Sequence, residues 1–132
     1  MKNFCFISIT VMLLTSCGGF FTEKEMYGYY VPIGYKNTFD TIELRSHGFY
    51  HRKVYNKNKE LALEMDGKWE IEREEIIRFH SFFFNLDRDI EKFPELIKDT
   101  VDDGGGWIGR EKNIIQFCVG YDVSSNCYRK IK

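Results

Sequence analysis

The stretch LALEMDGKWEIE, residues 61–72, alternates apolar and polar side chains on both sides of an Asp66-Gly67 pair. The apolar residues fall at odd positions up to Met65 and again from Trp69 onward. A two-residue period is typical of a β-strand with one buried face. Asp-Gly is a dipeptide typical of tight hairpin turns. The stretch therefore predicts a β-hairpin that turns at Asp66-Gly67.

Similar segments extend on both sides of this stretch. Residues 40–45 and 48–55 alternate around a Ser-His-Gly turn, and residues 76–83, 114–119 and 127–131 also have strand-like composition. The segment 85–106 interrupts the pattern and predicts one short helix or a long loop, with three glycines at 104–106 as a flexible exit. We therefore expect a mainly β fold, an antiparallel meander that forms an up-and-down barrel or a curved open sheet.

The N-terminal segment has the profile of a signal peptide. Lys2 precedes an apolar run over residues 4–14, which is shorter than the roughly 20 residues of a membrane-spanning helix. The run ends in Leu14-Thr15-Ser16-Cys17, which resembles the lipobox of bacterial lipoproteins. The resemblance implies that residues 1–16 are a cleaved signal peptide and that Cys17 carries diacylglyceryl and an acyl chain such as palmitate. The alternatives are an ordinary signal peptide with a fortuitous cysteine, or a buried N-terminal strand.

The lipobox resemblance also predicts where the protein resides. Two or three acyl chains on one residue give a stable membrane anchor, whereas a single chain holds only marginally. Gly18, which is not acidic, follows the cysteine, and by analogy with known lipoprotein sorting this implies the outer membrane, with the domain facing the periplasm. We expect residues 17–26 to form a lipidated tether and residues 27–132 to form the β domain.

Four cysteines predict one disulfide. Cys5 is removed with the signal peptide and Cys17 is lipidated, which leaves Cys118 and Cys127 in an oxidising compartment. They lie in two strand-like segments joined by a turn-rich stretch, so we expect them to pair across a hairpin. A redox or zinc role is disfavoured because the sequence has no Cys-x-x-Cys motif.

The chain as a whole resembles the small lipocalin-like domains of bacterial lipoproteins. The resemblance rests on Gly48-Phe49-Tyr50, on Asp66-Gly67-Lys68-Trp69 and on the closing cysteine-bearing hairpin, and it covers about residues 27–131. A barrel of this size either packs its interior with side chains or holds one small ligand. If it holds a ligand, we expect Tyr50, Trp69 and Phe79 to line the site. The alternative is a filled aromatic core.

The sequence gives little support for other functions. The 132 residues carry 19 Lys and Arg against 20 Asp and Glu, without the basic cluster that nucleic-acid binding needs. There is no Gly-x-Ser-x-Gly motif, no cysteine is left for catalysis, and the three histidines show no metal-ligand spacing. We therefore expect that the protein is not an enzyme and that it binds no cofactor and no metal.

Two functions remain open. The first is a membrane-anchored envelope protein whose β domain binds a small apolar molecule or lipid. The second is a structural or interaction lipoprotein with a packed core that binds another envelope protein. The run Phe82-Phe83-Phe84 places aromatic rings on both faces of its strand and is the predicted interaction patch.

Overall fold

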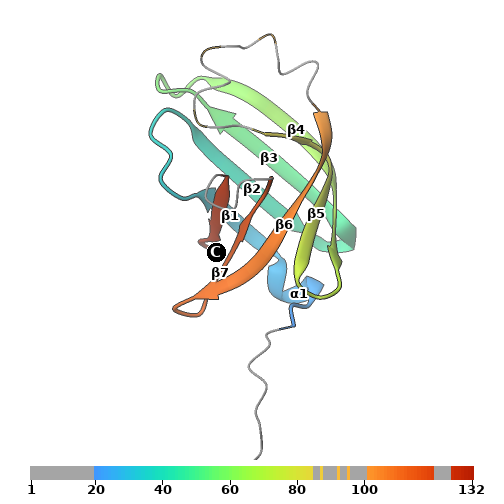
Figure 1. Ribbon diagram of the computed structural model, residues 1–132. Coiled ribbons are helices and arrows are strands. Elements are labelled where there is room, and N and C mark those ends of the chain that lie inside the picture. The colour runs from blue at the N-terminus through green and yellow to red at the C-terminus, as the bar shows by residue number, and fades with distance from the viewer. Residues whose placement is uncertain (1–19, 85–86, 88–91, 93–94, 96–100, 121–125) are drawn as a thin grey trace, which may run out of the picture.

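The protein is a closed antiparallel β-barrel with a short helix at one end (Figure 1). The computed structural model describes residues 20–84, 101–120 and 126–132, together with Asp87, Lys92 and Glu95. Within these residues the elements are α1 (Glu23–Met26), β1 (Gly28–Pro32), β2 (Phe39–Arg45), η1 (Ser46–Gly48), β3 (Phe49–Tyr55), β4 (Leu61–Glu72), β5 (Ile76–Phe83), β6 (Val101–Glu111), β7 (Ile114–Cys118) and β8 (Cys127–Lys130).

Each strand pairs with the next along the chain, and β8 pairs with β1 to close the barrel. The alternation on β2 shows how sequence determines the faces: Asp40, Ile42 and Leu44 point inward and are buried, while the residues between them are more exposed. The prediction of an up-and-down meander is confirmed, and of its two forms the closed barrel is the one observed. The predicted strands at 40–45, 76–83 and 114–119 correspond to β2, β5 and β7.

The predicted hairpin at Asp66-Gly67 is wrong, because residues 61–72 form the single strand β4. One part of β4 pairs with β3 as far as Lys68, and the part from Lys68 onward pairs with β5. Gly67 is required by packing: a Cβ there would lie 2.4 Å from Cε1 of Tyr50. The turn comes later, where Arg73 and Glu74 adopt positive φ angles of 52° and 63°.

The helix α1 closes one end of the barrel. Thr22 and Glu25 form a capping box at its start, and Met26 is fully buried and accepts a hydrogen bond from the Tyr30 hydroxyl at 2.8 Å through its carbonyl oxygen. The backbone N–H of Phe21 donates to the carbonyl of Glu74 at 3.0 Å. Residues 21–26 are therefore part of the folded domain, although they lie in the segment 17–26 expected to be a tether.

The predicted helix or loop at 85–106 lies mostly outside the described residues. Its last part, 101–106, belongs to β6, so the three glycines are part of a strand and not a flexible exit. Close approach explains Gly106, where a Cβ would lie 1.4 Å from the carbonyl oxygen of Cys118 on β7.

Asp87 secures the loop between β1 and β2 at the end opposite α1. Its carboxylate accepts hydrogen bonds from the backbone N–H groups of Lys36, Asn37 and Thr38 at 2.8–3.0 Å. Burial acts to raise the pKa of Asp87, but these backbone donors outweigh it and lower the pKa from its ordinary value.

Candidate functional site

The three residues predicted to bind a ligand all point into the barrel. Tyr50, Trp69 and Phe79 are 1%, 2% and 0% exposed. The Tyr50 hydroxyl donates to the carbonyl of Ser81 at 2.6 Å, and the Trp69 indole N–H donates to the carbonyl of Phe49 at 2.9 Å. Burial raises the pKa of Tyr50 to about 12. Their polar atoms are therefore occupied by the protein's own backbone.

Aromatic rings from several strands meet in the middle of the barrel. Phe79 lies with its ring centroid 5.2 Å from that of Tyr50, 4.7 Å from that of Phe82 and 5.6 Å from that of Phe117. Phe117 in turn stacks on Tyr128 at 5.6 Å. These separations are those of rings in direct contact. The aromatic residues therefore pack as a core and do not line an open space between them.

A buried ion pair lies beside this aromatic core. Arg52 of β3 is 0% exposed and Asp40 of β2 is 2% exposed. The guanidinium donates from Nε to Asp40 at 3.0 Å and from a terminal nitrogen to the other carboxylate oxygen at 2.7 Å. The Tyr128 hydroxyl donates to the same carboxylate at 2.8 Å. The arrangement is a two-point Arg-carboxylate pair, the geometry that the planar guanidinium fork favours.

The guanidinium makes two further contacts. It donates to the backbone carbonyl of Phe83 and lies 4.3 Å from the centre of the Phe82 ring. Burial disfavours the charged form of Arg52, but the neighbouring Asp40 carboxylate outweighs this and raises the pKa of Arg52. Burial also raises the pKa of Tyr128 well above its ordinary value.

The ion pair leaves Arg52 without a free edge for an anionic ligand. A fatty acid or another carboxylate would need the edge of the guanidinium that Asp40 occupies. This pair was not predicted from the sequence, although the alternation contains a signal for it. Asp40 stands two and four positions before Ile42 and Leu44, which face inward on β2. Arg52 stands midway between Tyr50 and Val54, which face inward on β3. A charge at an inward position of each of two paired strands indicates a buried salt bridge.

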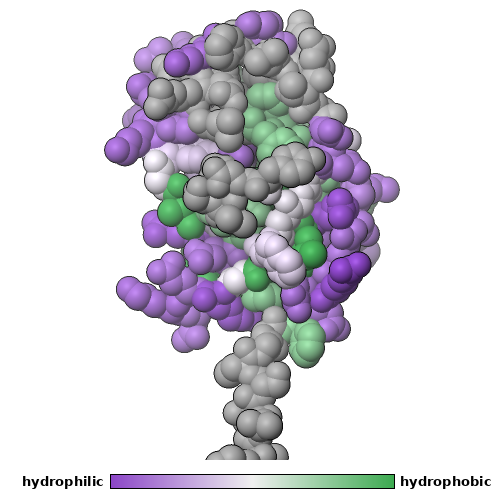
Figure 2. Space-filling model, viewed as in Figure 1, coloured by the Kyte–Doolittle hydropathy of each residue, from purple (hydrophilic) through white to green (hydrophobic). Residues whose placement is uncertain are grey.

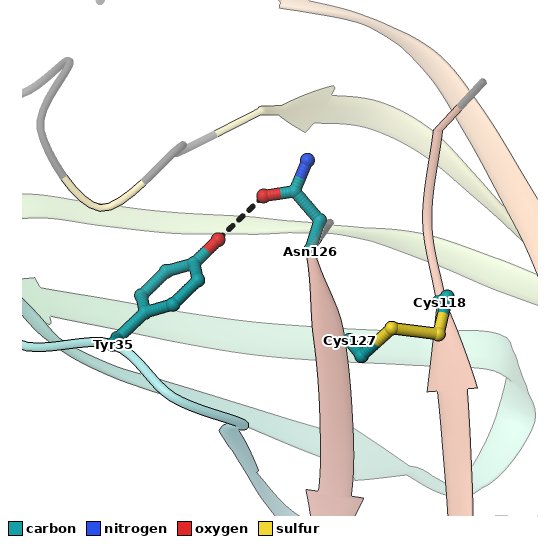
Figure 3. Close-up of a disulfide and its surroundings, with 4 residues drawn as sticks. All are labelled: Tyr35, Cys118, Asn126 and Cys127. Atoms are coloured by element: carbon teal, nitrogen blue, oxygen red, sulfur yellow. Dashed lines mark hydrogen bonds between the residues drawn. A yellow bond between two sulfur atoms is a disulfide. The ribbon is translucent and has the colours of Figure 1, made fainter. Parts of the chain in front are cut away.

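The predicted disulfide is confirmed. Cys118 of β7 and Cys127 of β8 are bonded across the strand pair (Figure 3). Beside them, the Tyr35 hydroxyl from the β1–β2 loop donates to the side-chain carbonyl of Asn126 at 2.5 Å. The disulfide and this hydrogen bond together hold the start of β8 and the β1–β2 loop at the end of the barrel opposite α1.

The run Phe82-Phe83-Phe84 is not the exposed patch that its sequence predicted. Phe82 and Phe83 are 0% and 2% exposed, and Phe84 is partly buried against Phe82 with ring centroids 5.7 Å apart. The reason is an irregularity in β5: Ser81 has a positive φ of 58°, and the register with β6 shifts between Phe79 and Phe82. This bulge places Phe79 and Phe82, three residues apart, in the same core cluster. Phe83 is buried in a second cluster, against Val54.

An exposed apolar row lies elsewhere, on the outer face of the barrel. Phe39 of β2 pairs with Tyr55 of β3, which pairs with Leu61 of β4. Phe39 is 59% exposed, Leu61 is 49% exposed and Tyr55 is half-buried. We call these three residues the apolar row; it lies near the end of the barrel opposite α1, because β2 and β4 begin there.

Charged side chains cover most of the remaining outer face of β2 to β5. His80 lies between two carboxylates, with its ring nitrogens 3.1 Å from Glu70 and 3.1 Å from Asp103. The hydrogen bond to Asp103, followed by that to Glu70, raises the pKa of His80. Among the residues described, no three His, Cys, Asp or Glu side chains are arranged to hold a metal ion.

The chain matches no known protein family, no curated protein and no solved structure. In the described part of the chain, no helix has the length and apolar character needed to cross a membrane.

Proposed function

We propose that this protein is a lipid-anchored envelope protein whose barrel is a packed, non-catalytic module that binds another envelope protein on its outer surface. One observation carries the choice between the two functions left open by the sequence. The barrel interior holds aromatic rings in mutual contact and an ion pair whose charged edge is already bound, at Arg52 and Asp40.

A carrier of apolar molecules would need space that those side chains occupy. The rings of Tyr50, Trp69 and Phe79 pack against other aromatic rings of the protein. The Tyr50 hydroxyl and the Trp69 indole N–H donate to backbone carbonyls. A packed core favours recognition through the surface, and the apolar row is the candidate contact. Exposed aromatic and aliphatic side chains on adjacent strands are the kind of residues that protein interfaces bury.

The anchor is tested by metabolic labelling with an alkyne fatty acid. We expect the wild-type protein to take up the label and Cys17→Ala to lose it entirely. Cys5→Ala is the matched control, because this cysteine lies inside the proposed signal peptide. Label that persists in Cys17→Ala would remove the basis for the anchor.

The surface is tested by a photo-crosslinking amino acid placed at Phe39 in living cells. The proposal predicts one discrete adduct of fixed mass, whose yield falls when Leu61 is changed to Ser. The control is the same crosslinker at Lys53, which lies on β3 and also faces outward. It should give no such adduct. A discrete adduct from Lys53 but none from Phe39 would place the partner elsewhere.

A further inference from the structure

Apolar side chains are also exposed around the end of the barrel that α1 closes. Phe20 lies directly before Phe21, which is hydrogen-bonded to the β4–β5 turn, and Trp107 pairs with Ile76 at the start of β5, beside the same turn. The other members begin β3, begin β7 or directly follow β8. We call this set the apolar collar; its members and exposed fractions are Phe20 (65%), Phe49 (50%), Trp107 (59%), Ile114 (46%) and Ile131 (57%).

Contacts to α1 place the parts of the collar at one end of the molecule. Arg110, near the end of β6, binds Glu25 of α1 at 2.8 Å, and the Lys130 ammonium donates to the carbonyl of Glu25 at 2.7 Å. The turn at His47 and Gly48, which precedes Phe49, shares a surface hollow with Phe21 and Glu23. Figure 1 shows α1 at the lower end of the barrel, and Figure 2 shows apolar residues among the hydrophilic ones at that end.

The path of the chain identifies what this end faces. Phe20 is three residues after Cys17, so it can lie at most about 11 Å from it. Phe21 is already fixed to the barrel through Glu74. If Cys17 is lipidated, the α1 end must therefore lie against the bilayer, and the end that carries the apolar row must point away from it.

We propose that the apolar collar contacts the lipid bilayer, with the Trp107 ring at the level of the headgroups. The inference rests on the proposed lipid anchor and adds to it a fixed orientation of the barrel on the membrane. A Trp side chain favours the membrane interface, because its apolar rings can be buried while its indole N–H stays hydrated. Phe side chains add buried apolar area.

The charges at this end define the kind of contact. Basic residues on the turns and termini alternate with acidic ones: Lys24, Arg73, Lys112 and Lys132 stand beside Glu23, Glu74, Glu75 and Glu111. Among the described residues of these turns and termini, basic side chains do not outnumber acidic ones, so no excess positive charge is available there for anionic lipid. The contact therefore depends on apolar burial, and added salt leaves it intact.

The experiment uses the mature full-length lipoprotein in phosphatidylcholine vesicles whose acyl chains are brominated close to the headgroup. Trp107 is exposed and Trp69 is 2% exposed inside the barrel, so bromine reports on Trp107. We expect a blue shift and strong quenching of wild-type emission on vesicle binding, unchanged in high salt. Trp107→Phe should lose the quenched component. Phe39→Trp in the Trp107→Phe background places the reporter at the opposite end and should stay unquenched.

The outcomes separate the two proposals. Protein that floats with the vesicles while Trp107 stays unquenched keeps the anchor and overturns the collar contact. Protein that fails to float overturns the anchor, and the collar contact with it. A blue shift that depends on protein concentration and is insensitive to bromine assigns the collar to a second copy of the chain and also overturns the membrane contact.

Discussion

The Arg52–Asp40 pair combines two charges in a place where water cannot reach either of them. Both side chains are fully buried, and each satisfies the other. Removing both charges from such a pair is often tolerated, whereas removing one leaves the other uncompensated in a medium of low dielectric constant. The stability of the barrel should therefore be sensitive to the loss of either charge.

We expect Asp40→Ala to lower the free energy of unfolding by about 3–5 kcal/mol, because Arg52 keeps its charge without a partner. Replacing both residues by apolar ones, Asp40→Leu with Arg52→Met, should recover most of this loss. Urea unfolding measures both effects. Glu72→Ala, which breaks a surface pair with Arg78, is the control and should cost at most about 1 kcal/mol. Equal losses in Asp40→Ala and Glu72→Ala would contradict the buried-pair interpretation.

The raised pKa of His80 predicts that the stability of the fold depends on pH. Its pKa is raised in the folded protein by Asp103 and Glu70, so the protonated ring stabilises the fold at pH values below the ordinary histidine pKa of about 6.5. This contribution is lost as the pH rises through the raised value. Relative to His80→Gln, the wild type should lose stability as the pH rises above about 6.5.

The size of this effect is small, because the His80 side chain is 40% exposed and solvent screens the interaction. Thermal unfolding at a series of pH values measures it. Asp103→Asn combined with Glu70→Gln keeps the histidine but removes both carboxylates, and should flatten the difference. A wild type that gains stability over His80→Gln as the pH rises would show that the sign is wrong.

At the scale of elements, glycine decides how closely β6 and β7 approach. Gly106→Ala should cost about 1–3 kcal/mol or more, since its Cβ would lie 1.4 Å from the carbonyl oxygen of Cys118. Gly109→Ala on the same strand is the matched control, because no atom lies within 4 Å of its Cβ position. Urea unfolding compares the two. Similar stability in the two variants would show that the strands can separate without cost.

The disulfide stabilises the last element of the barrel. Cys118 and Cys127 are separated by 9 residues, and closing such a loop contributes about 2–3 kcal/mol in the chain-entropy description. We expect Cys118→Ser with Cys127→Ser to lose this amount and to speed hydrogen exchange on β8. Cys17→Ser is the control that leaves both unchanged. Exchange that rises equally in all strands would contradict a local role.

Several strands of the barrel could be predicted from the local sequence. Alternation predicted β2 and β3, and strand-like composition predicted β5, β7 and β8. The Asp66-Gly67 dipeptide gave a wrong turn, because the need for glycine there comes from the Tyr50 ring on another strand. Alternation failed at Ser81, where one residue with positive φ lies between Phe79 and Phe82 and both rings join the same core cluster. Long-range contacts and bulges leave no local signal in composition.

The candidate site was predictable to a similar degree. Tyr50, Trp69 and Phe79 were correctly placed inside the barrel, but pattern alone does not show whether inward rings meet or leave a gap. The role of Asp40 and Arg52 required the register of β2 against β3, which pairs the two strands residue by residue.

In the whole molecule, we propose different functions for the two ends of the barrel. The α1 end carries the chain that leads to Cys17 and, in our proposal, rests on the membrane. The opposite end carries the apolar row and the loop held by Asp87 and Tyr35. In our proposal, the packed barrel between them is a rigid spacer that presents one surface at a fixed distance from the bilayer.

Native mass spectrometry of the mature protein, released from the membrane in detergent, tests whether the lipid-anchored barrel is filled by its own side chains. We expect a single species whose mass is that of residues 17–132 with one disulfide and its acyl groups, and no further bound molecule. A reproducible additional mass that is retained in the folded protein and lost on unfolding would contradict the filled interior and restore the ligand-carrier function.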